Sequence, residues 1–110
     1  MKRSLYIDEG IRLFNVGDYF MAHETLEEYW VEAPSDQRDF LQGLIQLSVG
    51  MHHYTRANLK GTRLQFAKAL KRLSGYPQTY DGVDIAAVRL FLEAAPANIE
   101  DAIPLSPPSL

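Results

Sequence analysis

Apolar residues recur three or four positions apart in five segments of the chain, the spacing that is typical of one face of a helix. Three of these segments follow a short polar residue of the kind that caps helices: Ser4, Asp18 and Asp84. We expect helices from Ser4 to the turn at Gly17, from Tyr19 to about Ala33, from a cap at Ser35 or Asp36 to Thr55, from the break at Asn58 and Gly61 to Leu73, and from Asp84 to the residue before Pro96. No segment predicts a strand. The pattern therefore predicts an all-α fold, with residues 97–110 as an extended, Pro-rich tail on the surface.

The third segment differs from the others because it lacks charged residues. Phe40 to Thr55 are sixteen residues without Lys, Arg, Asp or Glu, which is fewer than the ~18 apolar residues of a membrane span. A helix that is apolar on nearly all sides is covered on several sides. We therefore expect a helix at the centre of a bundle, with a neighbour close to its small residues Gly43, Gly50 and Ala57.

The composition is that of one folded domain over residues 1–110, with 46% hydrophobic and 23% charged residues. The chain has no cysteine, which excludes disulfides, thiolate metal ligands and a cysteine nucleophile. Its first ten residues lack the apolar run of a signal peptide. We expect a soluble, cytoplasmic protein without a membrane segment.

Charge is segregated along the chain, whose formal net charge is −3. Residues 1–39 hold nine acids and four bases, residues 40–80 six bases and no acid, and residues 81–110 five acids and one base. The basic stretch, residues 56–72, is either an anion-binding face or the solvated side of a helix beside an acidic one; the second is the more common case. The negative net charge argues against general nucleic-acid binding.

Two polar residues interrupt the apolar face of the second helix. That face is marked by Tyr19, Ala22, Leu26 and Trp30. His23 and Glu27 fall within the same arc and lie four residues apart, so their side chains are neighbours. A buried, ionised carboxylate needs a partner. We expect both residues to be buried and to face a polar stripe of the third helix, formed by Gln42, Gln46 and His53.

Two interpretations of this cluster stay open. In the first, His23 and Glu27 bind a divalent first-row metal, for which imidazole and carboxylate are competent ligands. The third ligand comes from the third helix, where His53 is preferred to His52 because it lies nearer the glutamine stripe. The metal would activate water for hydrolysis, with Glu24 as the general base. In the second, His23, Glu27, Gln46 and His53 form a structural hydrogen-bond network within a non-enzymatic helical interaction module. No serine has a triad partner at recognisable spacing, which argues against a serine hydrolase.

Three stretches of the chain carry motifs: LFNVGDYFMAHETLEEYW, then FLQGLIQLSVGMHHYTRAN followed by Gly61, then YDGVD. Together they resemble the bacterial and archaeal family called domain of unknown function 309, over about residues 7–85. The residues that match the pattern of that family are His23, Glu24, Leu26, Glu27, Glu28, Trp30, Phe40 to Gly43, Gln46, His53 and Asn58. Ala57 stands where glycine is usual, and Met21 where an acid is common.

The resemblance implies a small all-helical domain. Members of the family are sometimes labelled predicted metal-dependent hydrolases, on the strength of the same His and Glu residues. Whether the protein is an enzyme stays open, as do its substrate and its metal. Its partner is equally open between another protein and a second copy of the chain.

Overall fold

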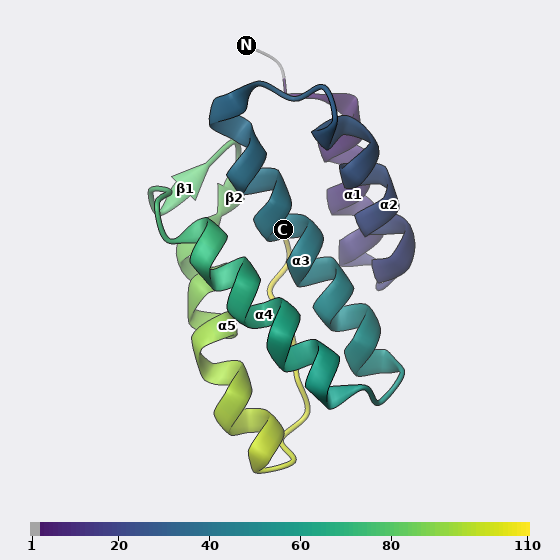
Figure 1. Ribbon diagram of the computed structural model, residues 1–110, viewed down its shortest axis with the longest axis vertical. Helices are drawn as coiled ribbons and strands as arrows, with labels where there is room; N and C mark the ends of the chain where they lie inside the picture. The colour runs from purple at the N-terminus through teal and green to yellow at the C-terminus, as the bar shows by residue number, and fades with distance from the viewer. Residues whose placement is uncertain (1–2) are drawn as a thin grey trace.

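Consecutive helices pack on one another along the chain, α1 on α2, α2 on α3, α3 on α4 and α4 on α5 (Figure 1). The computed structural model describes residues 3–110. The elements are α1 (Leu5–Asn15), α2 (Tyr19–Trp30), α3 (Ser35–Thr55), α4 (Leu59–Leu73), β1 (Thr79–Tyr80), β2 (Val83–Asp84) and α5 (Ile85–Glu100). Among the described residues, five helices and one short hairpin confirm the all-α prediction.

Side-chain caps begin helices where the sequence predicts them. The Ser4 hydroxyl accepts the backbone N–H of Tyr6 at 3.1 Å. The carboxylates of Asp18 and Asp84 each accept the N–H three residues ahead, at 3.3 and 3.0 Å. The third helix is different, because it begins at Ser35 directly after Pro34 and has no side-chain cap. The expectation of a cap from its first polar residues is therefore wrong.

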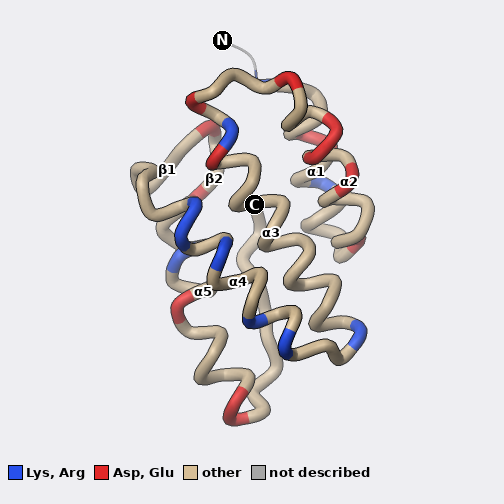
Figure 2. Tube along the Cα trace, in the orientation of Figure 1, with Lys and Arg blue, Asp and Glu red and all other residues tan. Residues whose placement is uncertain are grey.

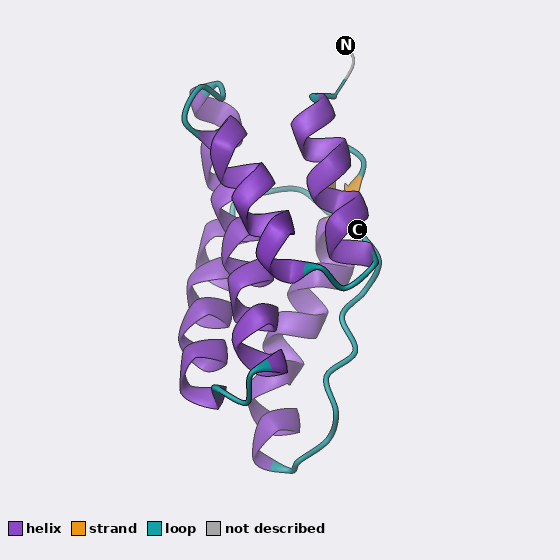
Figure 3. Cartoon of the chain, turned by 90° about the vertical axis from the view of Figure 1, so that its right-hand side faces the viewer, coloured by secondary structure: helices purple, strands orange, loops and turns teal. Residues whose placement is uncertain are grey.

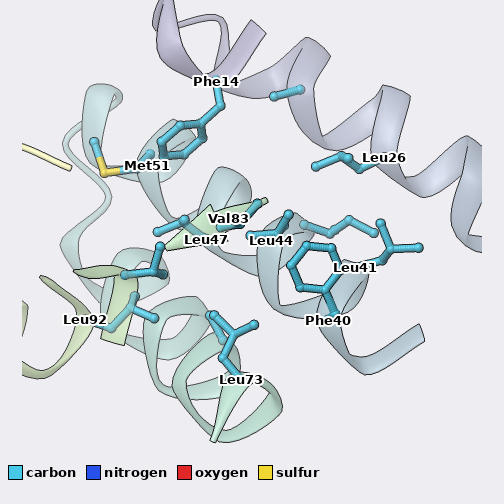
Figure 4. Close-up of a cluster of buried hydrophobic side chains, with 14 of the residues drawn as sticks. Phe14, Leu26, Phe40, Leu41, Leu44, Leu47, Met51, Leu73, Val83 and Leu92 are labelled. Atoms are coloured by element: carbon cyan, nitrogen blue, oxygen red, sulfur yellow. The ribbon is translucent and has the colours of Figure 1, made fainter. Parts of the chain in front are cut away.

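α3 lies between α2 and α4, in the central position that its lack of charge predicts. Its buried residues extend over several faces of the helix: Phe40, Leu41, Gly43, Leu44, Ile45, Gln46, Leu47, Ser48, Gly50 and Met51. Figure 4 shows part of the resulting core, in which side chains of α3 meet Phe14, Leu26, Leu73 and Leu92 from the other helices.

Two glycines let α4 approach α3 closely. An ideal Cβ built on Gly43 would lie 2.6 Å from the Leu73 side chain, and one built on Gly50 would lie 2.5 Å from the Phe66 ring. Both are therefore packing positions, as predicted. Ala57 is not a third member of this stripe, because it lies in the turn after α3 with a φ of 59°. That left-handed conformation explains why glycine suits this position.

Residues 79–84, where the sequence predicts no strand, form a short β-hairpin. Asp81 and Gly82, with φ values of 48° and 79°, form the turn between β1 and β2. Asp-Gly is a preferred pair for such a tight hairpin turn.

α5 continues through Pro96 to Glu100, so it is longer than predicted. A proline removes one helical hydrogen bond and crowds the preceding turn, but here it is exposed and the extra turn buries Ile99. The extended tail therefore begins after the helix rather than at residue 97.

The C-terminal tail runs back along the helices (Figure 3). The backbone N–H of Leu105 donates to the Tyr54 hydroxyl at 3.1 Å, and that of Leu110 donates to the Asn15 side chain at 2.8 Å. Leu105 itself is buried, so the tail also adds to the core. Within residues 3–110, no helix has the length and apolar character that crossing a membrane requires.

Candidate functional site

His23 lies on α2 with its imidazole held in one orientation. Its Nδ1 atom is 2.6 Å from the carbonyl oxygen of Phe20, one turn earlier in the helix. A carbonyl only accepts, so Nδ1 carries the hydrogen and Nε2 is left as the free ring nitrogen. Nε2 points toward two carboxylates, 3.8 Å from Glu27 and 3.9 Å from Glu24. These distances exceed those of hydrogen bonds.

Glu27 is not buried. Its side chain is 61% exposed, whereas that of His23 is 18% exposed, so the prediction that both lie inside the protein is wrong for Glu27. The physical reason is the width of the covered face of α2. Only Ala22 and Leu26 of this helix are fully buried, because α1 and α3 cover a narrow stripe and leave its flank open.

His53 faces the start of α4 rather than α2, the helix that it was expected to face. Its Nδ1 atom is 3.3 Å from the side-chain nitrogen of Asn58, the N-cap of α4, and its ring lies beside Gly61 in the first turn of that helix. His52 is the histidine that α3 turns toward α2, since its ring centroid is 5.4 Å from that of Phe20. The Phe20 ring is also 5.1 Å from that of His23.

Gln46 makes no hydrogen bond with His23 or His53 and lies beside residues of α4 instead. It is 9% exposed and lines a hollow together with Asp39, Lys68, Lys71 and Arg72. Its Oε1 atom is buried without a hydrogen-bond partner. The predicted network of His23, Glu27, Gln46 and His53 is therefore not formed. Gln42, the other member of the expected stripe, is half-buried on α3.

The described residues contain no group of three or more His, Asp or Glu side chains placed to hold a metal ion. His23 and the two nearby carboxylates are brought together, but His53, the predicted third ligand, is not among them.

Sequence reasoning missed a hollow of about 460 Å³ on the outer side of α2. Its lining combines large apolar with acidic residues: Phe20, Met21, Glu24, Thr25, Glu27, Glu28 and Val31. We call this surface the α2 hollow. Acidic residues follow α2 in Figure 2. A signal was present in the sequence, because Met21 and Val31 are apolar yet lie outside the face that Ala22 and Leu26 define.

Comparison with known proteins places the chain in a family. The family described as Domain of unknown function (DUF309) matches residues 7–64, which is more than half of the chain. The chain is 34% identical over 86 residues to "Uncharacterized protein YpuF" of Bacillus subtilis (strain 168), a match that covers 77% of this chain and 49% of that protein. It is 27% identical over 88 residues to an "Uncharacterized protein" of Aquifex aeolicus (strain VF5), covering 79% of this chain and 26% of that protein. The chain thus spans about half of the first relative and about a quarter of the second. It belongs to the family described as Domain of unknown function (DUF309).

Proposed function

We propose that the protein is an interaction module whose α2 hollow binds a basic, amphipathic helix of a partner protein. The observation that carries this proposal is the exposure of large apolar side chains around one acidic hollow. Phe20 is 46% exposed, Met21 45% and Val31 71%. Single exposed apolar residues are common, but several around one hollow are typical of binding surfaces.

Charge determines the class of partner. Glu24, Glu27 and Glu28 line the hollow, and α2 contains no Lys or Arg. A complementary segment therefore carries Lys or Arg beside its apolar residues. Met21 and Val31 are ten residues apart, which corresponds to about 15 Å along the helix axis. A partner helix of about three turns covers that length, in the manner of helices that dock into grooves.

The comparisons support a module rather than a self-contained activity. The segment shared with the two relatives makes up 49% of one protein and 26% of the other. A domain that occurs within chains of different length suits a binding role alongside the other segments of those chains.

A direct test measures the fluorescence anisotropy of a labelled helical peptide built from Leu and Lys, titrated with the full chain. We expect saturable binding, and at least about tenfold weaker binding of two control peptides, one with Leu replaced by Ser and one with Lys replaced by Glu. The Met21 methyl resonance should shift on addition of the first peptide only.

Matched variants locate the site. Met21→Gln and Glu24→Gln/Glu28→Gln should each weaken binding, because they remove apolar contact and charge respectively. Leu90→Gln and Glu93→Gln change similar residues of α5 that lie outside the hollow, so they should leave binding unchanged. Equal loss in both sets of variants, or equal binding of all three peptides, would refute the proposal.

A second candidate function, binding of a divalent first-row metal, is favoured by the orientation of His23. Its Nδ1 hydrogen bond to Phe20 directs Nε2 toward Glu27 and Glu24, and backbone bonds of this kind orient metal-bound histidines. In the hydrolytic form of this candidate, Glu24 stays unliganded and acts as the base for a metal-activated water. His53 would have to leave Asn58 to act as a third ligand.

Elemental analysis of protein made without a histidine tag, after growth with added metal, tests this candidate. Stoichiometric metal that is lost in His23→Gln and Glu27→Gln supports it. Two ligand sets are then open: His23, Glu27 and His53, as predicted from the sequence, or His23 with the two nearby carboxylates. The His53→Gln variant separates them, since only the first set needs His53. Absence of metal from the wild-type protein rejects both sets.

A further inference from the structure

A hollow of about 440 Å³ lies over α3 and α4, apart from the α2 hollow. It is lined by Asp39 and Gln46 of α3 and by Lys68, Lys71 and Arg72 of α4. We propose that this α3–α4 hollow binds the phosphate group of a small phosphomonoester. The site is independent of the proposed docking of a basic helix, because the two hollows share no residue.

The cations of the hollow differ in their pairing. Arg72 donates to the Asp39 carboxylate at 2.7 Å, and both residues of this ion pair line the hollow. Within the described part of the chain, neither Lys68 nor Lys71 has a carboxylate within 4.0 Å. Three cations and one carboxylate leave a positive balance at this place, and Figure 2 shows basic residues along α4. Two unpaired ammonium groups and a positioned guanidinium suit a doubly charged oxyanion.

Gln46 is the second, independent observation. It is 9% exposed, lines the hollow, and has a buried Oε1 atom without a partner among the described residues. The Oε1 atom is enclosed, so a donor in the hollow, such as a hydroxyl group or a water, can satisfy it only if the amide turns. The terminal torsion of glutamine is broad and two-fold, so its amide can turn either edge to the hollow. It would then donate N–H to a phosphate oxygen or accept from a hydroxyl of the ester.

The surroundings favour a small ligand over a polyanion. The chain as a whole has a net charge of −3, and the Asp39 carboxylate lines the hollow together with the cations. A phosphomonoester places its charge on Lys68, Lys71 and Arg72 and projects its hydroxyl groups toward Gln46.

The test is a titration of the full chain, followed by heteronuclear NMR, with inorganic phosphate and with glycerol 3-phosphate. Sodium chloride at the same ionic strength is the control. We expect saturable shifts of the Gln46 side-chain amide with both phosphates at millimolar concentration, and tighter binding of the ester. Binding of inorganic phosphate alone, with no gain from the ester, would identify a free-phosphate site and overturn the ester assignment.

Variants separate the site from general electrostatics. Lys68→Gln/Lys71→Gln should weaken phosphate binding by about tenfold or more, because charged hydrogen bonds are lost. Lys60→Gln removes one positive charge from the start of α4, about 12 Å from Lys68 along the helix, and should change binding less than twofold.

A third variant tests the role of the amide. Gln46→Met keeps the shape and removes the unsatisfied oxygen, so it should abolish the gain from the ester while keeping or raising the melting midpoint. Shifts that sodium chloride reproduces would overturn the proposal. So would an equal loss of binding in Lys60→Gln, or binding of duplex DNA in preference to the ester.

Discussion

An alanine at Gly50 would place its Cβ 2.5 Å from the Cδ1 and Cε1 atoms of the Phe66 ring. Carbon atoms in contact normally lie about 3.5–4.0 Å apart, so the ring would have to move by about 1 Å. Phe66 has little freedom to do so, because it is 2% exposed and its ring centroid is 5.5 Å from that of Phe91. We therefore expect Gly50→Ala to destabilise the protein.

Two opposing effects decide the magnitude. Replacing glycine by alanine inside a helix stabilises it by up to about 1 kcal/mol. Overpacking a well-filled core destabilises by about 1–3 kcal/mol. The short distance at Gly50 favours the upper part of that range, so the free energy of unfolding should fall by about 1–2 kcal/mol. For a chain of this size, the melting midpoint should fall by roughly 4–8 °C.

Urea denaturation followed by far-ultraviolet circular dichroism measures this change. Gly75→Ala is the matched control, because a Cβ at Gly75 has no atom within 4 Å and its φ is not left-handed. The control should change the unfolding free energy by less than about 0.5 kcal/mol. In Gly50→Ala/Phe66→Leu, the smaller leucine leaves room for the added Cβ. The unfolding free energy of this double variant should therefore fall by at least about 0.5 kcal/mol less than the two single variants predict by simple addition.

Two results would refute this reasoning. One is a melting midpoint of Gly50→Ala equal to or above that of Gly75→Ala, which would mean that α4 moves to make room without a loss of stability. The other is strict additivity with Phe66→Leu, which would mean that the loss arises somewhere other than this contact.

Three further predictions follow from the local environment of single residues. Ala57→Gly should raise the free energy of unfolding by up to about 1 kcal/mol, since its φ of 59° suits glycine; a lower urea midpoint would contradict this. Glu27→Gln and Glu27→Ala should each change stability by less than about 0.5 kcal/mol, because the side chain is 61% exposed; a loss above that would indicate burial in solution. Burial, and then the nearby Asp36 carboxylate, raise the pKa of Tyr80. Its contribution to stability is therefore complete below about pH 10 and is lost as the pH rises through the folded-state pKa. Tyr80→Phe should lessen the loss of stability between pH 9 and 11 in urea titrations, and an unchanged pH dependence would contradict the assignment.

More of the fold than of the candidate site could be predicted from the sequence. Helical spacing, the caps at Ser4 and Asp18, and the close approach at Gly50 are all confirmed. The predicted end of the fifth helix before Pro96 is wrong, because an exposed proline can stay in a helix when the following turn buries a residue such as Ile99. The low helix propensity of proline is a local preference, and burial of an apolar residue elsewhere in the helix can outweigh it.

The site could be predicted only in part, because a helical wheel gives the direction of a side chain but not what lies opposite it. His23 and Glu27 are neighbours, as their spacing predicts. The sequence could not show that α1 and α3 leave the flank of α2 open, which exposes Glu27 and forms the α2 hollow.

The sequence by itself determined the helices, the central place of α3 and the membership in the DUF309 family, because these depend on residue spacing and motifs within each segment. Only the tertiary structure decided the partners of the polar residues. It places His53 beside Asn58 and buries Gln46 beside the basic residues of α4. The physical reason is that the partners of a side chain depend on which helices pack against its face, and those helices come from distant parts of the chain.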